Sequence, residues 1–359
     1  MNHTLRNKKD INVAKFSSFS RSFITIAIVI SIFAMSSCTK KEETTSATMQ
    51  NTSQETAIVN IGISKIVQHV ALDNIEQGIQ DAIIGAGINA KFDLQNANGD
   101  VNTAAQIANK FKAEKVDIAV GIATPTAVAL AKAIHDTPVV FATVTDPIGA
   151  GLVETLDHGT NNVTGTSDAI PTEEHIKLFA KLANLKTLGY IYTSSEANSI
   201  SAMDRVKKGC DEAGITLITQ SISKSAEVKQ AAEAMVDRVD GLYLSTDNTV
   251  FSALSSLVQV FGKAKKPIFS GDVTGAMAGG CVFASGFNYY KAGIATGNMV
   301  VDILNGKKPA DIPVKLFTDP SETDFLIDLD AAKNCNLNIP QEYIDQANYI
   351  FQNGELLKK

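Results

Sequence analysis

Two stretches of this sequence, Val116–Thr126 (VDIAVGIATPT) and Val239–Thr249 (VDGLYLSTDNT), follow the same pattern 123 positions apart. Each begins with Val-Asp, continues with a short and mainly apolar run, and ends on polar residues that can start a helix. A buried strand followed at once by a helix is the repeating unit of a parallel α/β sheet. The repetition of this unit therefore predicts two similar α/β halves.

The sequence around both stretches alternates in the same way between short β-branched runs and amphipathic segments. The expected strands are 58–63, 90–94, 116–121 and 139–143 in the first half, and 187–192, 216–220, 241–245 and 267–269 in the second. The expected helices are 71–87, 101–114, 125–135, 198–213, 226–236 and 249–263. A repeat of this length is too long for a solenoid. We therefore expect two doubly wound, parallel-sheet lobes.

This arrangement also predicts where a ligand would bind. In open α/β sheets, ligands bind beyond the carboxyl ends of the strands. The junctions that follow the first, third and fourth strands of each half are short and polar. Their candidate binding residues are Gln68, Thr124, Pro125, Thr126, Thr145 and Asp146 in the first half, and Asn198, Ser199, Asp247, Asn248 and Asp272 in the second. Two such rims facing one another would form a cleft for a small polar molecule.

The chemistry of these junctions suits both charges of a small ligand. Thr124 and Pro125 are typical of a helix start, where free N–H groups and the helix dipole favour an anion. Asp146, Asp247 and Asp272 could each accept hydrogen bonds from an ammonium group. Each of these residues can also serve only to cap a helix or a turn, and that second interpretation stays open.

Residues typical of catalysis or of a cofactor site are few. No GxGxxG segment follows a first strand, and the sequence contains no GxSxG or P-loop motif. His69 with Asp73 is the single acid–base pair that an enzyme could use at a junction. Cys210, Cys281 and Cys335 lack CxxC spacing, so we expect inert thiols and no zinc site. The sequence thus predicts a binding protein without catalytic residues, metal or cofactor.

The N-terminal segment is typical of an exported protein. A basic start precedes an apolar run, Phe23–Met35, that is shorter than the roughly 20 residues needed to span a bilayer. The following Ser-Ser-Cys38 resembles a bacterial lipobox, which implies that residues 1–38 form a lipoprotein signal peptide and that lipidated Cys38 becomes the mature N-terminus. The alternative is an ordinary signal peptide, and mass spectrometry of the mature N-terminus distinguishes the two.

Residues 39–56 contain almost no large apolar side chain, so we expect a disordered tether between the anchor and the folded part. From Cys38 onward the chain has 27 Lys and Arg against 37 Asp and Glu. This negative charge argues against nucleic acid as a partner.

Several segments occur in the order found in one protein family. They are Gln68–Asp73 (QHVALD), Thr124–Ala127 (TPTA), Thr143–Pro147 (TVTDP), Asn162–Gly165 (NVTG), Glu196–Ser199 (EANS) and Gly286–Tyr290 (GFNYY). Together they resemble the ABC-transporter substrate-binding proteins of the tryptophan/tyrosine type, which have the type I periplasmic-binding-protein fold. The resemblance extends from Ile58 to Ile350.

The resemblance implies two lobes that are joined by hinge crossovers and close on an aromatic amino acid or a similar molecule. The ligand carboxylate would meet Thr124, Thr126, Asn198 and Ser199. The ammonium would meet Asp247 as first choice or Asp272 as second, and Asp247→Ala is then expected to abolish binding. The walls of the side-chain slot would come from Tyr192, Phe287 and Tyr289.

The same resemblance implies a domain plan and partners. Lobe 1 would comprise 57–168 with part of 286–330 returning to it, lobe 2 would comprise 169–285, and 331–359 would pack on the lobes. We expect a monomer that is anchored to a membrane, faces the periplasm or cell exterior, and delivers its ligand to an ABC permease. The alternative is a lipoprotein of the same fold that signals to a receptor.

Overall fold

The computed structural model describes residues 57–317 and 319–359. The expected signal peptide, the lipidation site Cys38 and the tether lie outside these residues. Within the described residues, no helix combines the length and the apolar character that crossing a membrane requires.

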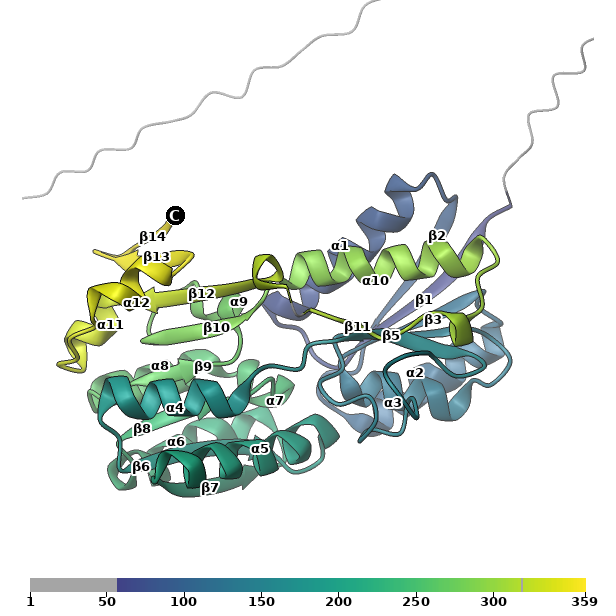
Figure 1. Cartoon of the computed structure of the whole chain (residues 1–359). Coiled ribbons are helices and arrows are strands. Elements are labelled where there is room, and N and C mark those ends of the chain that lie inside the picture. Colours follow the sequence, from purple (N-terminus) through teal and green to yellow (C-terminus); the bar gives the residue numbers. More distant parts are fainter. Residues whose placement is uncertain (1–56, 318) are drawn as a thin grey trace, which may run out of the picture. The chain divides into compact units, whose positions relative to one another are not determined.

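The first sheet has six strands in the order β11-β5-β4-β3-β1-β2, and all its neighbours are parallel. Its strands are β1 (Val59–Lys65), β2 (Ala90–Asn96), β3 (Ile118–Ile122), β4 (Val139–Ala142), β5 (Val163–Ser167) and β11 (Lys315–Leu316). Its helices are α1 (Val70–Gly85), α2 (Val101–Glu114), α3 (Thr124–Ala133) and α10 (Tyr289–Leu304). α1 and α10 cover one face, and α2 and α3 cover the other (Figure 1). We call this unit lobe 1.

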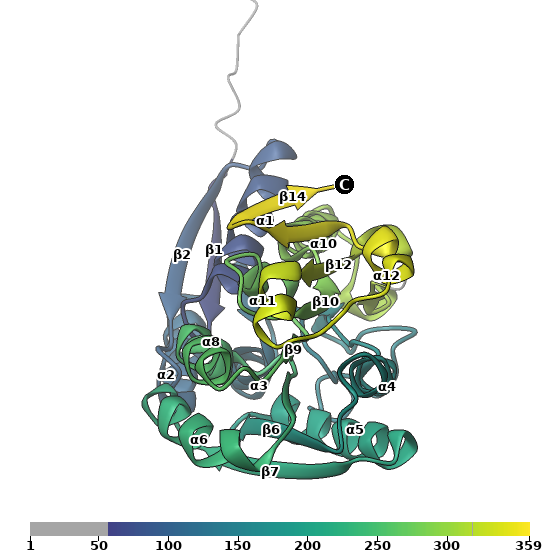
Figure 2. The same ribbon diagram turned by 90° about the vertical axis from the view of Figure 1, so that its left-hand side faces the viewer.

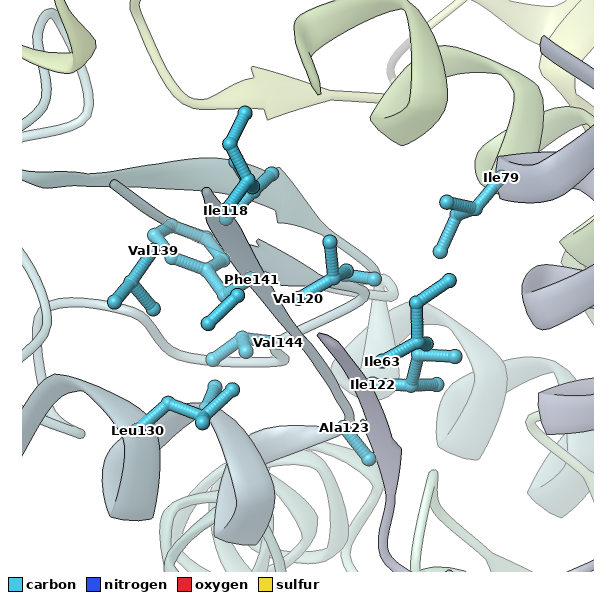
Figure 3. Packing of buried hydrophobic residues seen from close by; sticks show 14 of the residues in the cluster. Ile63, Ile79, Ile118, Val120, Ile122, Ala123, Leu130, Val139, Phe141 and Val144 are labelled. Atoms are coloured by element: carbon cyan, nitrogen blue, oxygen red, sulfur yellow. The ribbon is translucent and has the colours of Figure 1, made fainter. Parts of the chain in front are cut away.

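The central strands of lobe 1 are buried on both faces. Every residue of β3 and β4 is buried, and both strands read as continuous apolar runs. This composition is expected where helices cover both sides of a parallel sheet. Figure 3 shows Val120, Phe141 and Leu130 among the side chains of this core, which extends to Ala123 at the carboxyl end of β3.

The second sheet has eight strands in the order β14-β13-β12-β10-β9-β8-β6-β7. They are β6 (Thr187–Thr193), β7 (Thr216–Ile222), β8 (Gly241–Leu244), β9 (Ile268–Ser270), β10 (Phe283–Phe287), β12 (Thr323–Asp328), β13 (Tyr349–Gln352) and β14 (Glu355–Lys358). Its helices are α4 (Thr172–Ala183), α5 (Ala197–Ala213), α6 (Val228–Met235), α7 (Asn248–Phe251), α8 (Leu254–Lys263), α9 (Val273–Ala276), α11 (Leu329–Asn334) and α12 (Gln341–Gln346). Figure 2 shows α4 and α5 on one side of the sheet and α6 and α8 on the other. We call this unit lobe 2.

The predicted fold class, two doubly wound α/β lobes, is confirmed, with one addition. The β10–β12 and β13–β14 pairs are antiparallel, so one side of the second sheet is mixed. The chain crosses between the sheets three times: from β5 to α4, from β10 to α10, and from β11 to β12 (Figure 1). The three crossings place the carboxyl ends of both sets of parallel strands on the same cleft.

The eight predicted strands are present, and the predicted helix 249–263 is wrong in one respect. It consists of two helices, α7 and α8, separated at Ser252 and Ala253. The Ser252 hydroxyl donates a 2.7 Å hydrogen bond to the Thr249 carbonyl, and such local bonds compete with a continuous helix. The break makes α7 a single turn whose start lies at the cleft.

Lobe 1 is completed by a close packing of α10 against α1. A Cβ atom at Gly293 would lie 2.3 Å from the Ile75 carbonyl oxygen and 3.0 Å from the Cα of Gly78. Only glycine permits the two backbones to approach this closely. This contact holds the segment that returns from lobe 2 to the first sheet.

We therefore expect Gly293→Ala to lower the free energy of unfolding by about 1–3 kcal/mol, because the added methyl group forces the helices apart. Gly262→Ala in α8 is the matched control, since no atom lies within 4 Å of the added Cβ there. The control should leave stability unchanged or raise it by up to about 1 kcal/mol. Chemical denaturation measures both, and equal effects of the two substitutions would contradict the packing argument.

Candidate functional site

The carboxyl ends of strands from both sheets line a cavity whose space for the centre of a water-sized sphere is ≈ 20 Å³. Room for a larger ligand therefore requires the lobes or the lining side chains to move apart. The lining residues are His69, Leu72, Ala123, Thr124, Thr143, Thr145, Asp168, Asn198, Thr246, Asp247, Asn248, Phe251, Asp272 and Tyr289. Three of them are aspartates, and no lysine or arginine of the described chain lines the cavity.

The two lobes are hydrogen-bonded directly to one another beside this cavity. The hydroxyl oxygens of Thr145 in lobe 1 and Thr246 in lobe 2 lie 2.9 Å apart. Outside the cavity, Ser201 of α5 donates a 2.7 Å hydrogen bond to Asp146 of lobe 1. Such direct contacts between opposite rims mean that the cleft is closed.

Asp168 directly follows β5 and is 4 % exposed. It accepts hydrogen bonds from the Thr145 hydroxyl (2.9 Å) and the Tyr289 phenol (3.3 Å). Burial raises the pKa of Asp168 to about 7 and outweighs these two hydrogen bonds, and the nearby Asp272 carboxylate raises this pKa further. Asp168 is therefore a buried acid without a cationic partner in the cavity.

Asp272 is the second carboxylate on this side of the cavity. Its Oδ1 caps α9 by accepting hydrogen bonds from the Thr274 and Gly275 N–H groups, at 2.7 Å and 3.4 Å. Burial raises the pKa of Asp272 to about 6 despite these bonds. A cationic group in the cavity would stabilise the ionised form of both acids.

Asp247 lines the cavity, but protein donors already occupy its carboxylate. Thr193 contacts it through its N–H (2.6 Å) and its hydroxyl (2.8 Å), Ser199 through its hydroxyl (2.7 Å), and Val250 through its N–H (2.9 Å). A carboxylate offers about four acceptor positions. Burial, and secondly the charge of nearby Glu196, raise the pKa of Asp247. Asp247 thus ties β6, α5 and α7 together.

Glu196 makes a second buried connection between α5 and α7. It accepts hydrogen bonds from the side chains of Asn248 (2.6 Å), Thr249 (2.7 Å) and Asn198 (3.2 Å), and from the Thr249 N–H (3.0 Å). Because these bonds fix the amide groups of both asparagines, Asn198 and Asn248 present a defined face to the cavity.

Two polar atoms at the cavity lack a hydrogen-bond partner in the described structure. They are Nε2 of His69 and Oδ1 of Asn198, and both atoms are shielded from solvent. Unpaired buried polar atoms are rare in native proteins and call for an explanation such as a missing ligand. Burial lowers the pKa of His69 to about 4, so its imidazole is neutral near pH 7. Both atoms are therefore available to a ligand.

The start of α3 forms the lobe 1 rim of the cavity. Ala123 has a φ of +73°, a backbone conformation that costs free energy for a residue with a side chain. The Thr126 hydroxyl donates to the Ile122 carbonyl at 2.6 Å, while the Thr124 hydroxyl has no partner among the described residues. The strained turn therefore presents Thr124 and the first N–H groups of a ten-residue helix to the cavity.

The structure brings seven of the twelve predicted binding residues to the cavity: Thr124, Thr145, Asn198, Asp247, Asn248, Asp272 and Tyr289. The other five lie outside its lining. Gln68 is exposed, Pro125 and Thr126 lie within the first turn of α3, and the Ser199 hydroxyl is bound to Asp247. Asp146 lines a neighbouring cavity, where it accepts hydrogen bonds from Ser201 and the Gly149 N–H.

Two of the three aromatic residues expected as slot walls also lie elsewhere. Tyr192 stacks on Tyr190 with ring centroids 5.9 Å apart, and Phe287 packs against Phe317 at 5.6 Å. Tyr289 does line the cavity, and its hydroxyl group donates a hydrogen bond to Asp168.

Seven lining residues were not among the predicted binding residues: His69, Leu72, Ala123, Thr143, Asp168, Thr246 and Phe251. Asp168 directly follows a fifth parallel strand, VTGTS, that was not predicted. The rule that ligands bind beyond strand ends would have found Asp168 had this strand been recognised. Leu72 and Phe251 read as ordinary core residues, and the sequence carries no signal that they face a cavity.

The described residues contain no group of three or more His, Cys, Asp or Glu side chains that could hold a metal ion. Cys210, Cys281 and Cys335 are free thiols. Burial raises the pKa of Cys210 to about 12 and that of Cys335 to about 11, which makes both thiols poor nucleophiles.

The sequence of the chain matches a model of ABC transporter substrate-binding proteins over residues 60–350. The chain belongs to the family of ABC transporter substrate-binding proteins. Members of this family are extracytoplasmic solute receptors and not enzymes. The family resemblance expected from the sequence is thereby confirmed.

Three relatives of this substrate-binding protein bear on its cavity. The "Tyrosine-binding protein" of Clostridioides difficile is 32 % identical over 332 residues, covering 91 % of this chain and 94 % of that protein. A Streptococcus pneumonia ABC domain in complex with L-Trp is 34 % identical, covers 82 % and 100 % of the two chains, and gives a TM-score of 0.78. A ligand-free, open substrate-binding protein with adhesive properties from Clostridium difficile is 35 % identical. The match covers 79 % of this chain and 96 % of that chain and gives a TM-score of 0.58.

The raised pKa of Asp168 predicts how an Asp168→Asn substitution changes stability. An acid whose pKa is higher in the folded state than in the unfolded state lowers the free energy of unfolding when it ionises. This loss grows as the pH rises from about 4 to 7 and is complete above pH 7. Asp168→Asn should therefore raise the melting temperature of the ligand-free protein at pH 8. This gain should disappear as the pH approaches 4.

The exposed Asp136 provides a matched control, and Asp136→Asn should leave the melting temperature nearly unchanged at both pH values. Thermal unfolding from pH 4 to pH 8 measures both variants. A lower melting temperature of Asp168→Asn at pH 8 would show that Asp168 stabilises the ligand-free fold, contrary to this prediction.

Proposed function

We propose that this chain captures an aromatic amino acid as a zwitterion in the closed cavity and delivers it to an ABC importer. The observation that carries the proposal is the charge of the cavity, which holds three aspartates and no cationic side chain of the described chain. Burying carboxylates without a cation is costly. A ligand with an ammonium group removes this cost.

Asp168 is the proposed partner of the ammonium group. Unlike Asp247, it receives only two protein hydrogen bonds, so it retains free acceptor positions. The unpartnered Oδ1 of Asn198 can accept a further ammonium hydrogen bond from lobe 2. One charged group would thus contact both lobes, as a ligand that stabilises the closed state must.

The α3 start is the proposed site of the ligand carboxylate. Its first N–H groups and helix dipole favour an anion, and the free Thr124 hydroxyl adds a donor. Pro125 removes one N–H at this end without weakening the helix. The negative carboxylate would then lie away from Asp247, whose charge is already compensated by four donors.

Leu72 and Phe251 are the proposed walls for the aromatic ring. Both are buried, and they come from opposite lobes. The names of two relatives, a tyrosine-binding protein and an L-Trp complex, support an aromatic ligand. The lobes are arranged more like those of the L-Trp complex than those of the open protein, although both are about equally similar in sequence.

The membrane part of the proposal rests on the sequence and the family. The lipobox-like segment at Cys38 supports a lipid anchor, and residues 39–56 would keep the folded part within reach of the membrane. A receptor that is held beside its permease can deliver a captured ligand without diffusing away.

Calorimetry with matched analogues tests the proposal on the full chain purified in mild detergent. L-Tyrosine and L-tryptophan should bind. Tyramine, which lacks the carboxylate, and 3-(4-hydroxyphenyl)propionate, which lacks the ammonium, should each bind at least about thirtyfold more weakly, since loss of one partner of a buried charge pair costs at least about 2 kcal/mol.

Asp168→Asn should lose affinity for L-tyrosine while keeping its weak affinity for 3-(4-hydroxyphenyl)propionate, which has no ammonium to lose. Asp136→Asn again serves as the control. If L-tyrosine, L-tryptophan and L-phenylalanine all fail to bind, the proposed ligand class is wrong. If tyramine binds as tightly as L-tyrosine, the carboxylate site at α3 is wrong.

A further inference from the structure

Two hydrogen bonds between the lobes differ in whether a ligand can replace them. Thr145 and Thr246, whose hydroxyl oxygens lie 2.9 Å apart, both line the ligand cavity, so a bound molecule can take the place of either partner. The 2.7 Å bond from the Ser201 hydroxyl to Oδ2 of Asp146 lies beside the neighbouring cavity, and neither residue lines the ligand cavity. This second bond therefore requires closed lobes but no contact with the ligand.

Asp146 is held in position within lobe 1. It follows β4 in a turn where its carbonyl accepts a 2.9 Å hydrogen bond from the Ala150 N–H. Its Oδ1 accepts a 2.8 Å hydrogen bond from the Gly149 N–H. Among the described residues, Ser201 of lobe 2 is the one donor to Oδ2. Lobe 1 thus orients the carboxylate and leaves one of its oxygens for the other lobe.

The chain leaves room for this oxygen at Gly149. A Cβ atom at position 149 would lie 2.2 Å from Oδ2 of Asp146, which is the oxygen that accepts from Ser201. The φ of Gly149 is not positive, so other residues can adopt its backbone conformation. A side chain at this position would therefore displace the carboxylate without straining the turn.

Ser201 is held in position within lobe 2. It lies in α5, whose first turn is tied to lobe 2 by the 2.7 Å bond from the Ser199 hydroxyl to Asp247. A serine hydroxyl inside a helix often bonds to a carbonyl of the preceding turn, whereas that of Ser201 donates to Asp146. When the lobes separate, water or the carbonyl of Ala197 can accept this hydrogen. Opening therefore leaves no buried polar group unpaired.

We propose that the bond between Ser201 and Asp146 is a latch that stabilises the closed lobes and slows release of the ligand. Its effect should be the same factor for every ligand that closes the lobes. This inference rests on the proposed capture of an aromatic amino acid by closure. It adds two positioning residues, because neither Ser201 nor Asp146 touches the ligand.

The expected size of the effect follows from the equilibrium between open and closed lobes. The Kd of a ligand that binds only the closed state is inversely proportional to the fraction of closed protein. Removing the latch lowers this fraction equally for all such ligands. The neighbouring cavity offers ≈ 300 Å³ for the centre of a water-sized sphere, so water competes for both partners. We therefore expect a factor of about three to ten.

The test compares Ser201→Ala with the unaltered full chain in mild detergent. Calorimetry should show the Kd values of L-tyrosine, L-tryptophan and 3-(4-hydroxyphenyl)propionate rising by one common factor of about three to ten. The chain contains no tryptophan, so the fluorescence of L-tryptophan reports capture and release in stopped flow. The dissociation rate constant should rise by about the same factor, while the association rate constant changes little.

Three further variants separate the latch from other effects of substitution. Gly149→Ala keeps both bonding groups and displaces Oδ2 of Asp146, so it should also raise all three Kd values. Ser201→Thr keeps the hydroxyl group and should retain most of the affinity. Ser255→Ala is the matched control, because Ser255 is an exposed serine on another helix of lobe 2, α8. It should change neither the Kd values nor the rate constants.

Two readouts distinguish a latch from a structural role and from a ligand contact. The melting temperature of the ligand-free protein should not fall in Ser201→Ala, because we expect the ligand-free lobes to be mainly open and alanine favours a helix. The ratio of the Kd values of L-tyrosine and 3-(4-hydroxyphenyl)propionate should stay constant in Ser201→Ala. In Asp168→Asn this ratio should change, because only L-tyrosine carries an ammonium.

Unchanged Kd values and dissociation rates in both Ser201→Ala and Gly149→Ala would overturn the inference while leaving the proposed amino-acid binding intact. Unequal losses of affinity among the three ligands in Ser201→Ala would also overturn it, since Ser201 would then act on the ligand. If none of the aromatic amino acids binds, the proposed function fails and this inference fails with it.

Discussion

A carboxylate buried between two lobes without a cation to neutralise it is the constraint on which this binding site depends. Asp168 lies at the end of β5, where the chain leaves lobe 1, and its two hydrogen bonds come from neutral hydroxyl groups. Closing the lobes removes the water that would otherwise solvate it, so closure without a ligand carries a free-energy cost. A bound ammonium group would pair with the carboxylate, so that burying Asp168 favours closure instead of opposing it.

This constraint explains how capture and closure can be coupled. A ligand shifts a conformational equilibrium only by its difference in affinity for the two states. The hydroxyl groups of Thr145 and Thr246 join the rims directly, and Thr145 also contacts Asp168. Ionisation of Asp168 by a bound ammonium therefore strengthens a hydrogen-bond chain that spans both lobes.

The remaining carboxylates show that an acid at a strand end need not touch the ligand. Asp247 and Glu196 each receive at least four hydrogen bonds from the junctions of lobe 2. These bonds fix the asparagines that line the cavity. Holding the lining in place before the ligand arrives reduces the ordering cost of binding.

Much of the fold was predictable because its determinants are local. The Val-Asp repeat, the apolar runs and the polar junctions predicted two parallel-sheet lobes and their facing strand ends. The crossings between the lobes were harder to predict from the sequence. The helix α10 packs on α1 through Gly293, about 200 positions further along the chain, and no periodicity of the sequence indicates this contact.

The site was predictable only as a region. Parallel strands bring their ends together, and Thr124, Asn198 and Asp272 line the cavity as this rule predicts. Which acid stays unpaired depends on hydrogen bonds between residues more than 40 positions apart, such as those of Asp247 with Thr193 and Ser199. Sequence reasoning could not count these donors, and its choice of Asp247 for the ammonium stays a prediction.

The central claim, that a ligand ammonium neutralises Asp168, is tested most directly by the ionisation state of Asp168 in two complexes, read from the ¹³C resonance of its carboxyl group at pH 6. In the closed cavity without a cation, burial raises the pKa of Asp168 to about 7, so Asp168 should be largely protonated in the complex with 3-(4-hydroxyphenyl)propionate, which has no ammonium. In the complex with L-tyrosine, Asp168 should be ionised. A protonated Asp168 in the L-tyrosine complex at pH 6 would contradict the claim.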